Sequence, residues 1–158
     1  MSPAAAIVTL CGLGRVRPAP GTVASLVAAI AAFGVAMIGG RISVLLVGIF
    51  AMAFGSWAAE HYARESGHPD PSECVIDEVA GQFLACAFAP RTLLGFTLAF
   101  LLFRALDIFK PWPISLAERL PGGLGIVADD VVAGVIAGLV IIILVQILPL
   151  PLWGRWLG

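Results

Sequence analysis

Residues 79–103 read VAGQFLACAFAPRTLLGFTLAFLLF, a run in which Arg91 is the only charged residue. Such a run is long enough to cross a bilayer once, because about 20 apolar residues span the hydrocarbon core. Pro90 and Arg91 interrupt it, however. Proline removes a backbone donor, and an arginine at bilayer depth costs at least ~2.5 kcal/mol. The sequence therefore favours two short helices, about 75–89 and 92–106, which turn back at Pro90-Arg91 as short spans or as a re-entrant pair.

The composition of the whole chain places these helices in lipid. Of 158 residues, 60% are apolar and 12% are charged, and the mean hydropathy is +1.03, whereas a soluble domain carries about 25% charged residues. A chain this short has too much surface to hide that much apolar side chain inside itself. Nine Lys and Arg against ten Asp and Glu give a net charge of −1, which excludes the basic footprint of a nucleic-acid-binding protein. We therefore expect an integral membrane protein.

Three further stretches lack charge for long enough to span a membrane: 23–40, 42–59 and 131–150. Only Arg41 separates the first two, which predicts a tight helical hairpin. In the third, Gly134 and Gly138 form a G-x-x-x-G pattern. This pattern is typical of close helix packing, although glycine is also frequent in membrane helices generally.

The expected fold class is all-α. We expect a polytopic membrane helical bundle of four to five apolar helices, with the short or re-entrant pair at 75–106 and an interfacial helix near 113–120. No linker, repeat or low-complexity tract divides the chain. Residues 1–158 are therefore expected to form a single domain.

The distribution of basic residues predicts which side of the bundle faces the cytoplasm. With a turn at Pro90-Arg91, the N-terminal segment and the loops 60–78 and 104–122 share one side of the membrane. That side carries Arg15, Arg17, Arg64, Arg104, Lys110 and Arg119, and the other side carries Arg41, Arg91 and Arg155. Cytoplasmic loops carry the excess of Lys and Arg. We therefore expect the shared side to face the cytoplasm, in a bacterial inner membrane or an equivalent one.

The sparse acidic residues gather on that same side, at the ends of the expected helices. Five of them directly abut apolar runs: Asp77, Glu78, Asp107, Asp129 and Asp130. Carboxylates that are partly removed from water need partners, yet only Arg104 and Lys110 are near in sequence, and Arg104 shares a helix face with Asp107. Capping and the helix dipole explain any one of these acids. They explain five at one face less well, because the group has a surplus of negative charge.

A divalent cation resolves this surplus. Oxygen ligands suit Mg²⁺ or Mn²⁺ rather than zinc, and several carboxylates can hold the two ions that clamp attacking and leaving oxygens in phosphoryl transfer. The expected ligands of one or two ions are Asp77, Glu78, Asp129 and Asp130. Asp107 is expected to be a further ligand or a general base, which makes all five carboxylates catalytic candidates. Arg104, Lys110 and Arg15 are then expected to bind phosphate oxygens.

Four short motifs resemble the bacterial phosphatidylglycerophosphatase A family, in the order that the family has them. They are Pro20-Gly21-Thr22, Val75-Ile76-Asp77-Glu78-Val79-Ala80-Gly81, Phe103-Arg104-x-x-Asp107-Ile108-x-Lys110-Pro111-x-Pro113, and Gly122-Gly123-x-Gly125-Ile126-x-x-Asp129-Asp130-x-x-Ala133-Gly134. The motifs extend over about residues 12–140. Ala24 and Val127 depart from the usual family residues, and neither is a carboxylate.

The resemblance implies an inner-membrane, Mg²⁺-dependent phosphatase. Its substrate would be phosphatidylglycerophosphate, a lipid of the bilayer, and its products would be phosphatidylglycerol and phosphate. Other interpretations stay open: a phosphatase for another lipid phosphate such as phosphatidic acid, or a cation transporter or non-catalytic membrane protein that uses the same carboxylates. A transporter would need its carboxylates near the bilayer midplane, whereas these lie at helix ends. The sequence leaves open the number of metal ions, whether water or an aspartate attacks, and whether the protein forms oligomers.

Overall fold

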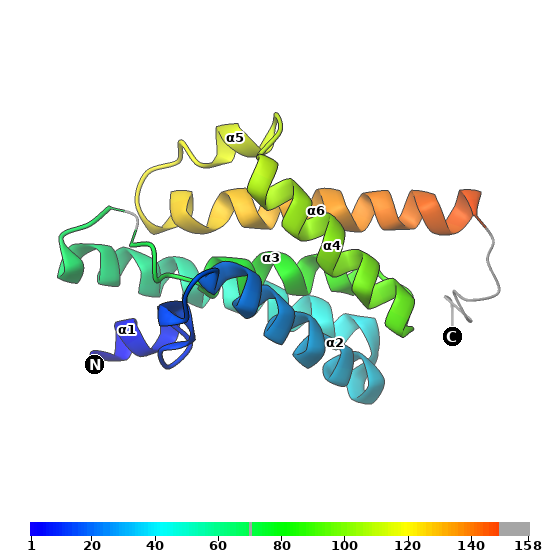
Figure 1. Ribbon diagram of the computed structural model, residues 1–158, viewed down its shortest axis with the longest axis horizontal. Coiled ribbons are helices and arrows are strands. Elements are labelled where there is room, and N and C mark those ends of the chain that lie inside the picture. The colour runs from blue at the N-terminus through cyan, green and yellow to red at the C-terminus, as the bar shows by residue number, and fades with distance from the viewer. Residues whose placement is uncertain (70, 149–158) are drawn as a thin grey trace.

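The computed structural model describes residues 1–69 and 71–148. All regular structure in these residues is helical, which confirms the expected all-α class. The chain begins with a short helix, α1 (Pro3–Val8), and a single 3-10 turn, η1 (Leu13–Arg15). The remaining helices are α2 (Pro20–Ser66), α3 (Ile76–Ala87), α4 (Leu93–Phe109), the one-turn α5 (Ile114–Ala117) and α6 (Gly123–Ile147) (Figure 1).

Helix α2 folds back on itself at Gly40 (Figure 1). Gly40 has a φ of 73°, a left-handed value that glycine adopts without the steric cost of a Cβ atom. Both ends of α2 consequently meet the start of α3, where Gly21 packs against Glu78 and Gly55 packs against Ile76. The expected helical hairpin is therefore present, with its bend at the residue before the lone arginine.

The expected turn at Pro90-Arg91 also separates two helices, α3 and α4. Thr92 caps α4, because its Oγ1 accepts a hydrogen bond of 3.1 Å from the Gly95 backbone N–H. Helix α4 continues past the predicted end at residue 106 and stops at Phe109. Pro111 explains this end, since a proline disfavours helical backbone in the residue before it.

Among the described residues, two helices, α2 and α6, are long and apolar enough to cross a membrane, fewer than the four to five expected. The difference arises because both arms of the hairpin belong to α2, and because α3 and α4, with 12 and 17 residues, fall short of a full span. The expected interfacial helix at 113–120 is reduced to α5. The last residues of the 131–150 stretch, and Arg155, lie outside the described residues.

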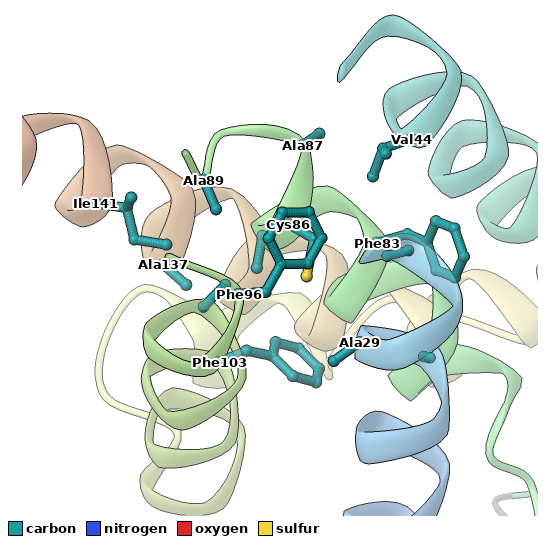
Figure 2. Packing of buried hydrophobic residues seen from close by; sticks show 14 of the residues in the cluster. Ala29, Val44, Phe83, Cys86, Ala87, Ala89, Phe96, Phe103, Ala137 and Ile141 are labelled. Carbon is teal, nitrogen blue, oxygen red and sulfur yellow. The ribbon is translucent and has the colours of Figure 1, made fainter. Parts of the chain in front are cut away.

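The core combines small, branched and aromatic side chains from helices α2 to α6, and Figure 2 shows part of it. Helix α2 contributes mainly alanines, and the largest side chains are Phe83 from α3, Phe96 and Phe103 from α4, Ile114 from α5 and Ile141 from α6. Small residues let helix backbones approach closely, which is how helices associate where the solvent itself is apolar.

Helices α3 and α6 cross at close range. A Cβ atom at Gly81 would collide with the backbone carbonyl of Asp130, and one at Gly134 would collide with the carbonyl of Gly81. One turn further along α6, Gly138 lies against the ring of Phe88. The G-x-x-x-G face of α6 is therefore a packing face, and it fixes the start of α3 beside the start of α6.

The outward faces of the long helices remain apolar. Large side chains are exposed along α2, α4 and α6, among them Leu26, Ile30, Ile38, Ile42, Phe50, Phe54, Leu101, Leu139 and Ile143. Soluble monomers rarely expose contiguous apolar surface on this scale. The loops before α3 and before α6 lie toward one end of the molecule, and the bend of α2 lies toward the other (Figure 1).

Candidate active site

A pocket of about 470 Å³ opens at the end of the molecule that carries the loops before α3 and α6. All five carboxylates that the sequence singled out line it, together with Lys110. The complete lining is Pro69, Pro71, Ser72, Cys74, Asp77, Glu78, Asp107, Lys110, Glu118, Leu120, Gly122, Gly125, Ile126, Asp129 and Asp130. The fold therefore brings these five acids together in one pocket.

The helix crossing explains why acids so distant in sequence meet. Asp77 and Glu78 occupy the first turn of α3, where the helix dipole favours negative charge. One turn later, Gly81 lies against the backbone of Asp130 on α6. Phe103 of α4 packs against the same glycine, which brings the last turns of α4, with Asp107, to the same place.

Three of the five carboxylates converge. Asp77, Glu78 and Asp130 each offer an oxygen within 4.8 Å of the other two. Glu78 Oε2 is buried without a hydrogen-bond partner. Among the described residues, the ion pairs of the site engage Asp107 and Asp129 and do not engage these three. Buried carboxylate oxygens without a cation carry a large desolvation cost, so this set fits a divalent cation by its chemistry.

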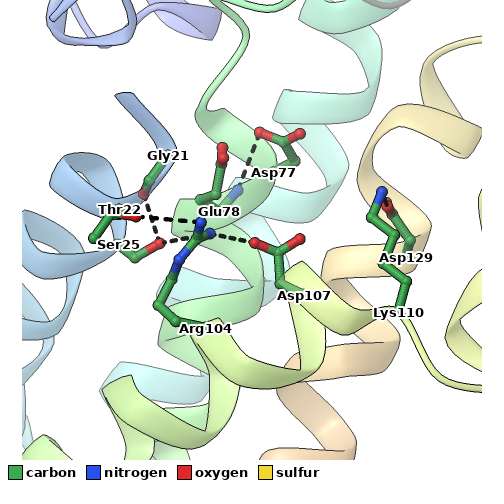
Figure 3. Close-up of polar contacts among 9 residues, drawn as sticks. All are labelled: Gly21, Thr22, Ser25, Asp77, Glu78, Arg104, Asp107, Lys110 and Asp129. Carbon is green, nitrogen blue, oxygen red and sulfur yellow. Dashed lines mark hydrogen bonds and ion pairs between the residues drawn. The ribbon is translucent and has the colours of Figure 1, made fainter. Parts of the chain in front are cut away.

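Asp107 belongs to a different arrangement, which Arg104 organises (Figure 3). The Arg104 guanidinium forms an ion pair with Asp107 through Nη1, as their i, i+3 spacing predicted. The same guanidinium reaches α2, where Nη1 lies 3.5 Å from Ser25 Oγ and Nη2 lies 3.4 Å from Thr22 Oγ1. The Arg104 side chain is only 14% exposed and is not among the residues that line the pocket. Arg104 therefore contacts Asp107 from the side that faces away from the pocket.

Asp129 is held by Lys110. The Lys110 ammonium donates to Asp129 Oδ2 at 2.6 Å and lies 3.3 Å from Glu118 Oε1. Partial burial alone would lower the pKa of Lys110, but hydrogen bonds and charge interactions with Asp129 and Glu118 raise that pKa above its ordinary value. The pocket therefore holds a lysine whose charged form is favoured beside the acid cluster. Asp129 itself, expected to be a metal ligand, is not one of the three converging carboxylates.

Arg15 lies apart from the pocket. Its Nη2 is 3.9 Å from Glu73 Oε1, and its side chain is more than half exposed. Glu73 also accepts a hydrogen bond from the Tyr62 hydroxyl. The structure thus brings Lys110 and the acids together and does not bring Arg15 to them.

Three residues of the site were not anticipated. Thr22 and Ser25 hold Arg104; Thr22 belongs to the motif Pro20-Gly21-Thr22, whereas Ser25 lies outside all four motifs. Glu60, on the returning arm of α2, accepts a hydrogen bond of 2.5 Å from the Gly123 backbone N–H at the start of α6. An acid near a helix end carries no signal of such a partner, because the contact spans 63 residues.

The geometry of this pocket suits chemistry on a phosphate group. An acid cluster suited to a divalent cation lies in the same pocket as a lysine, so a doubly charged phosphate can be neutralised from two sides. Asp107 lines the pocket and is fixed from behind by Arg104.

The comparisons with known proteins identify a family of phosphatases. A family model described as Phosphatidylglycerophosphatase A matches residues 6–145. A phosphatidylglycerophosphatase A of Haemophilus influenzae is 38% identical over 138 residues, which cover 82% of this chain and 81% of that protein. The protein of the same name from Escherichia coli is 36% identical over 94 residues, covering 58% and 55% of the two chains.

A further relative carries a different name. A putative phosphatidylinositol-3-phosphatase of Bacteroides thetaiotaomicron is 40% identical over 93 residues, 57% of each chain. No solved structure matches the chain. The family model covers most of the sequence, including all four motifs, and the Haemophilus relative covers most of it as well. The chain therefore belongs to the phosphatidylglycerophosphatase A family of enzymes.

Proposed function

We propose that the protein is a Mg²⁺-dependent lipid phosphatase that hydrolyses phosphatidylglycerophosphate to phosphatidylglycerol and phosphate. The observation that carries the proposal is the meeting, in one pocket, of three converging carboxylates and the Lys110 ammonium. The family and the names of two relatives support this choice of substrate. We further propose that this pocket faces the cytoplasm at a bacterial inner membrane.

The metal would be held by Asp77, Glu78 and Asp130. Their oxygens lie within 4.8 Å of one another, and the buried, unpartnered Glu78 Oε2 is the atom that most needs a cation. Oxygen donors of this kind favour Mg²⁺, with Mn²⁺ as a substitute. When bound, the cation would neutralise phosphate charge and activate the attacking water. Asp129 is the candidate ligand for a second ion, once Lys110 has moved from it to the phosphate.

Side chains of the protein would bind the phosphate and accept the proton of the attacking water. Lys110 is the cation that faces the pocket, so its ammonium would contact the phosphate oxygens. Asp107, fixed by Arg104, would accept the proton of the attacking water. Arg104 lies outside the pocket lining, so it would orient Asp107 rather than touch the phosphate.

The membrane arrangement is part of the proposal. We propose a polytopic bundle in which both arms of α2 and helix α6 cross the bilayer, while α3 and α4 act as shorter apolar helices packed among them. The exposed apolar faces of α2, α4 and α6 support this arrangement. The acids then lie at helix ends, at the depth of a lipid headgroup.

A second candidate substrate is another lipid phosphate. The name of the Bacteroides relative favours phosphatidylinositol 3-phosphate, and phosphatidic acid is the simplest member of the class. All of these are phosphomonoesters on a glycerolipid, so the same acids and lysine would serve each of them.

The experiment is phosphate release by the purified protein from all three lipids, with Mg²⁺ and with a chelator. We expect the highest kcat/KM for phosphatidylglycerophosphate and loss of activity on chelation, restored by added Mg²⁺. Activity that persists in the chelator would contradict the metal site. A higher kcat/KM for either other lipid would replace the substrate and keep the chemistry.

Two variants locate the metal site. Asp77→Asn and Asp130→Asn should each weaken Mg²⁺ activation by more than about 100-fold, because loss of a direct ligand exceeds the 10- to 100-fold cost of an outer-shell change. Glu65→Gln, an exposed acid outside the pocket, is the matched control. Near-normal turnover in either aspartate variant removes that residue from the site, provided that circular dichroism shows an unchanged helix content.

A further inference from the structure

The segment between α4 and α6 and the first turn of α6 carry exposed apolar side chains, one of which lines the pocket. Trp112, Leu116, Leu120 and Leu124 are 77%, 45%, 50% and 62% exposed. We call these four residues the apolar rim. We propose that the apolar rim lies in the lipid bilayer and that the lipid substrate enters the pocket over it, with its acyl chains against Leu116 and Leu120. This inference rests on the proposed function, because it assumes a phosphate bound in the pocket.

The two loops of the pocket differ in what they expose. The loop before α3 contributes Pro69, Pro71 and Ser72 to the lining. Between Trp57 and Leu93 the described residues expose no large apolar side chain. The other loop exposes four within 13 residues. Exposed apolar patches mark interaction surfaces, so the pocket has one side suited to lipid and one side suited to water.

Leu120 connects the rim to the site. It lines the pocket together with Lys110 and Asp129, and half of its surface is exposed. Ile126, a second apolar residue of the lining, follows on α6. A lipid phosphate needs a polar place for its phosphate and a continuous apolar path for its chains. Leu120 supplies the start of that path.

The segment between α4 and α6 is anchored to the bundle, and it exposes a positive charge that suits an anionic lipid surface. Ile114 is fully buried in the main core, and the Gly125 backbone lies against the Leu120 carbonyl, which anchors the segment to the bundle. Glu118 turns toward Lys110 in the pocket, whereas Arg119 is exposed beside Leu120. Tryptophan, leucine and arginine exposed together are typical of a segment that lies at the surface of anionic lipid.

The first experiment compares two substrates with the same headgroup. A dioleoyl lipid phosphate is presented in phosphatidylcholine vesicles, and a water-soluble analogue carries short acyl chains. For the double variant Leu116→Ser/Leu124→Ser, two rim residues outside the pocket lining, we expect kcat/KM on the dioleoyl lipid to fall about tenfold, since each leucine loses apolar contact with lipid, and kcat/KM on the soluble analogue to stay within about twofold.

The matched control is Leu93→Ser/Leu94→Ser, two exposed leucines at the start of α4, outside the pocket lining. It should leave the ratio of the two kcat/KM values unchanged. An equal fall for both substrates in the rim variant, or no change for either, overturns the proposal. If the wild-type protein hydrolyses neither substrate, the proposed function fails, and the second experiment still decides the rim.

The second experiment needs no catalysis. In a Cys11→Ser background, Leu120→Cys and Ser72→Cys are labelled with the same small fluorophore, and the proteins are placed in vesicles whose phospholipids have brominated acyl chains. Both positions are exposed and line the pocket, and Cys11→Ser alone measures any label on the buried Cys74 and Cys86. We expect quenching at position 120 and little at position 72. Equal quenching, or stronger quenching at position 72, overturns the proposal.

Discussion

At the scale of the residue, the two cations of the site differ in what they can reach. Lys110 lines the pocket, whereas Arg104 contacts Asp107, Thr22 and Ser25 and stays outside the lining. A lysine ammonium acts as a mobile point charge, whereas the arginine fork fixes several partners at once. The sequence analysis predicted that both Arg104 and Lys110 bind the phosphate. The sequence gives the spacing of these residues but not the direction in which each side chain points.

This difference predicts opposite kinetic effects. Lys110→Ala should mainly raise KM for the lipid phosphate, since it removes a contact to the substrate. Arg104→Lys should lower kcat by about 10- to 100-fold with little change in KM, because a misplaced catalytic group costs rate rather than binding. The measurement is steady-state phosphate release at saturating Mg²⁺.

Arg64→Lys is the control for the arginine change, since Arg64 pairs with Glu60 at the exposed surface and lies outside the pocket lining. It should leave both constants unchanged. A raised KM with an unchanged kcat in Arg104→Lys would mean that Arg104 touches the phosphate after all.

At the scale of the element, the site depends on the crossing of α3 and α6. Gly134→Ala would push a Cβ atom into the Gly81 carbonyl, and overpacking of this kind typically costs about 1–3 kcal/mol. We expect a lower unfolding temperature in detergent and weaker Mg²⁺ activation, because Asp130 would move away from Asp77. Both are measured on the same preparation.

Gly34→Ala is the matched substitution, since no atom lies within 4 Å of a Cβ built there. Removing glycine from an open helical position should stabilise the protein by roughly 0.5–1 kcal/mol. Equal behaviour of the two variants would show that the crossing has room to relax and that the glycines are not what brings the acids together.

The elements also show what the sequence can and cannot reveal. Proline and charge marked the turn at Pro90-Arg91 correctly, because both act locally on the backbone. The gathering of the five acids followed from their places at helix ends. Their places at helix ends did not predict how the acids divide. Asp77, Glu78 and Asp130 form one cluster, whereas Asp107 pairs with Arg104 and Asp129 pairs with Lys110. This division depends on how closely two glycine-bearing helices cross and on contacts such as the one between Glu60 and Gly123, which no local pattern encodes.

At the scale of the whole molecule, the charges make the bundle asymmetric. The segments that carry Arg15, Arg17, Arg64, Arg104, Lys110 and Arg119 lie on the side of the pocket loops, and the opposite side has Arg41 and Arg91 among the described residues. The pocket lies on the more basic side. Cytoplasmic segments retain the positive charge, so the same bias that orients the chain would place the pocket inside the cell.

Cysteine accessibility in cells tests this orientation. In the Cys11→Ser background, Ile42→Cys lies near the bend of α2 and Ser72→Cys lies at the pocket, and both positions are exposed. A membrane-impermeant maleimide should label Ile42→Cys in intact spheroplasts and should label Ser72→Cys only after the membrane is opened. The reverse pattern would place the pocket outside the cell. Labelling of both from one side would mean that the arms of α2 do not cross the bilayer, because a hairpin that spans it must separate its bend from its ends.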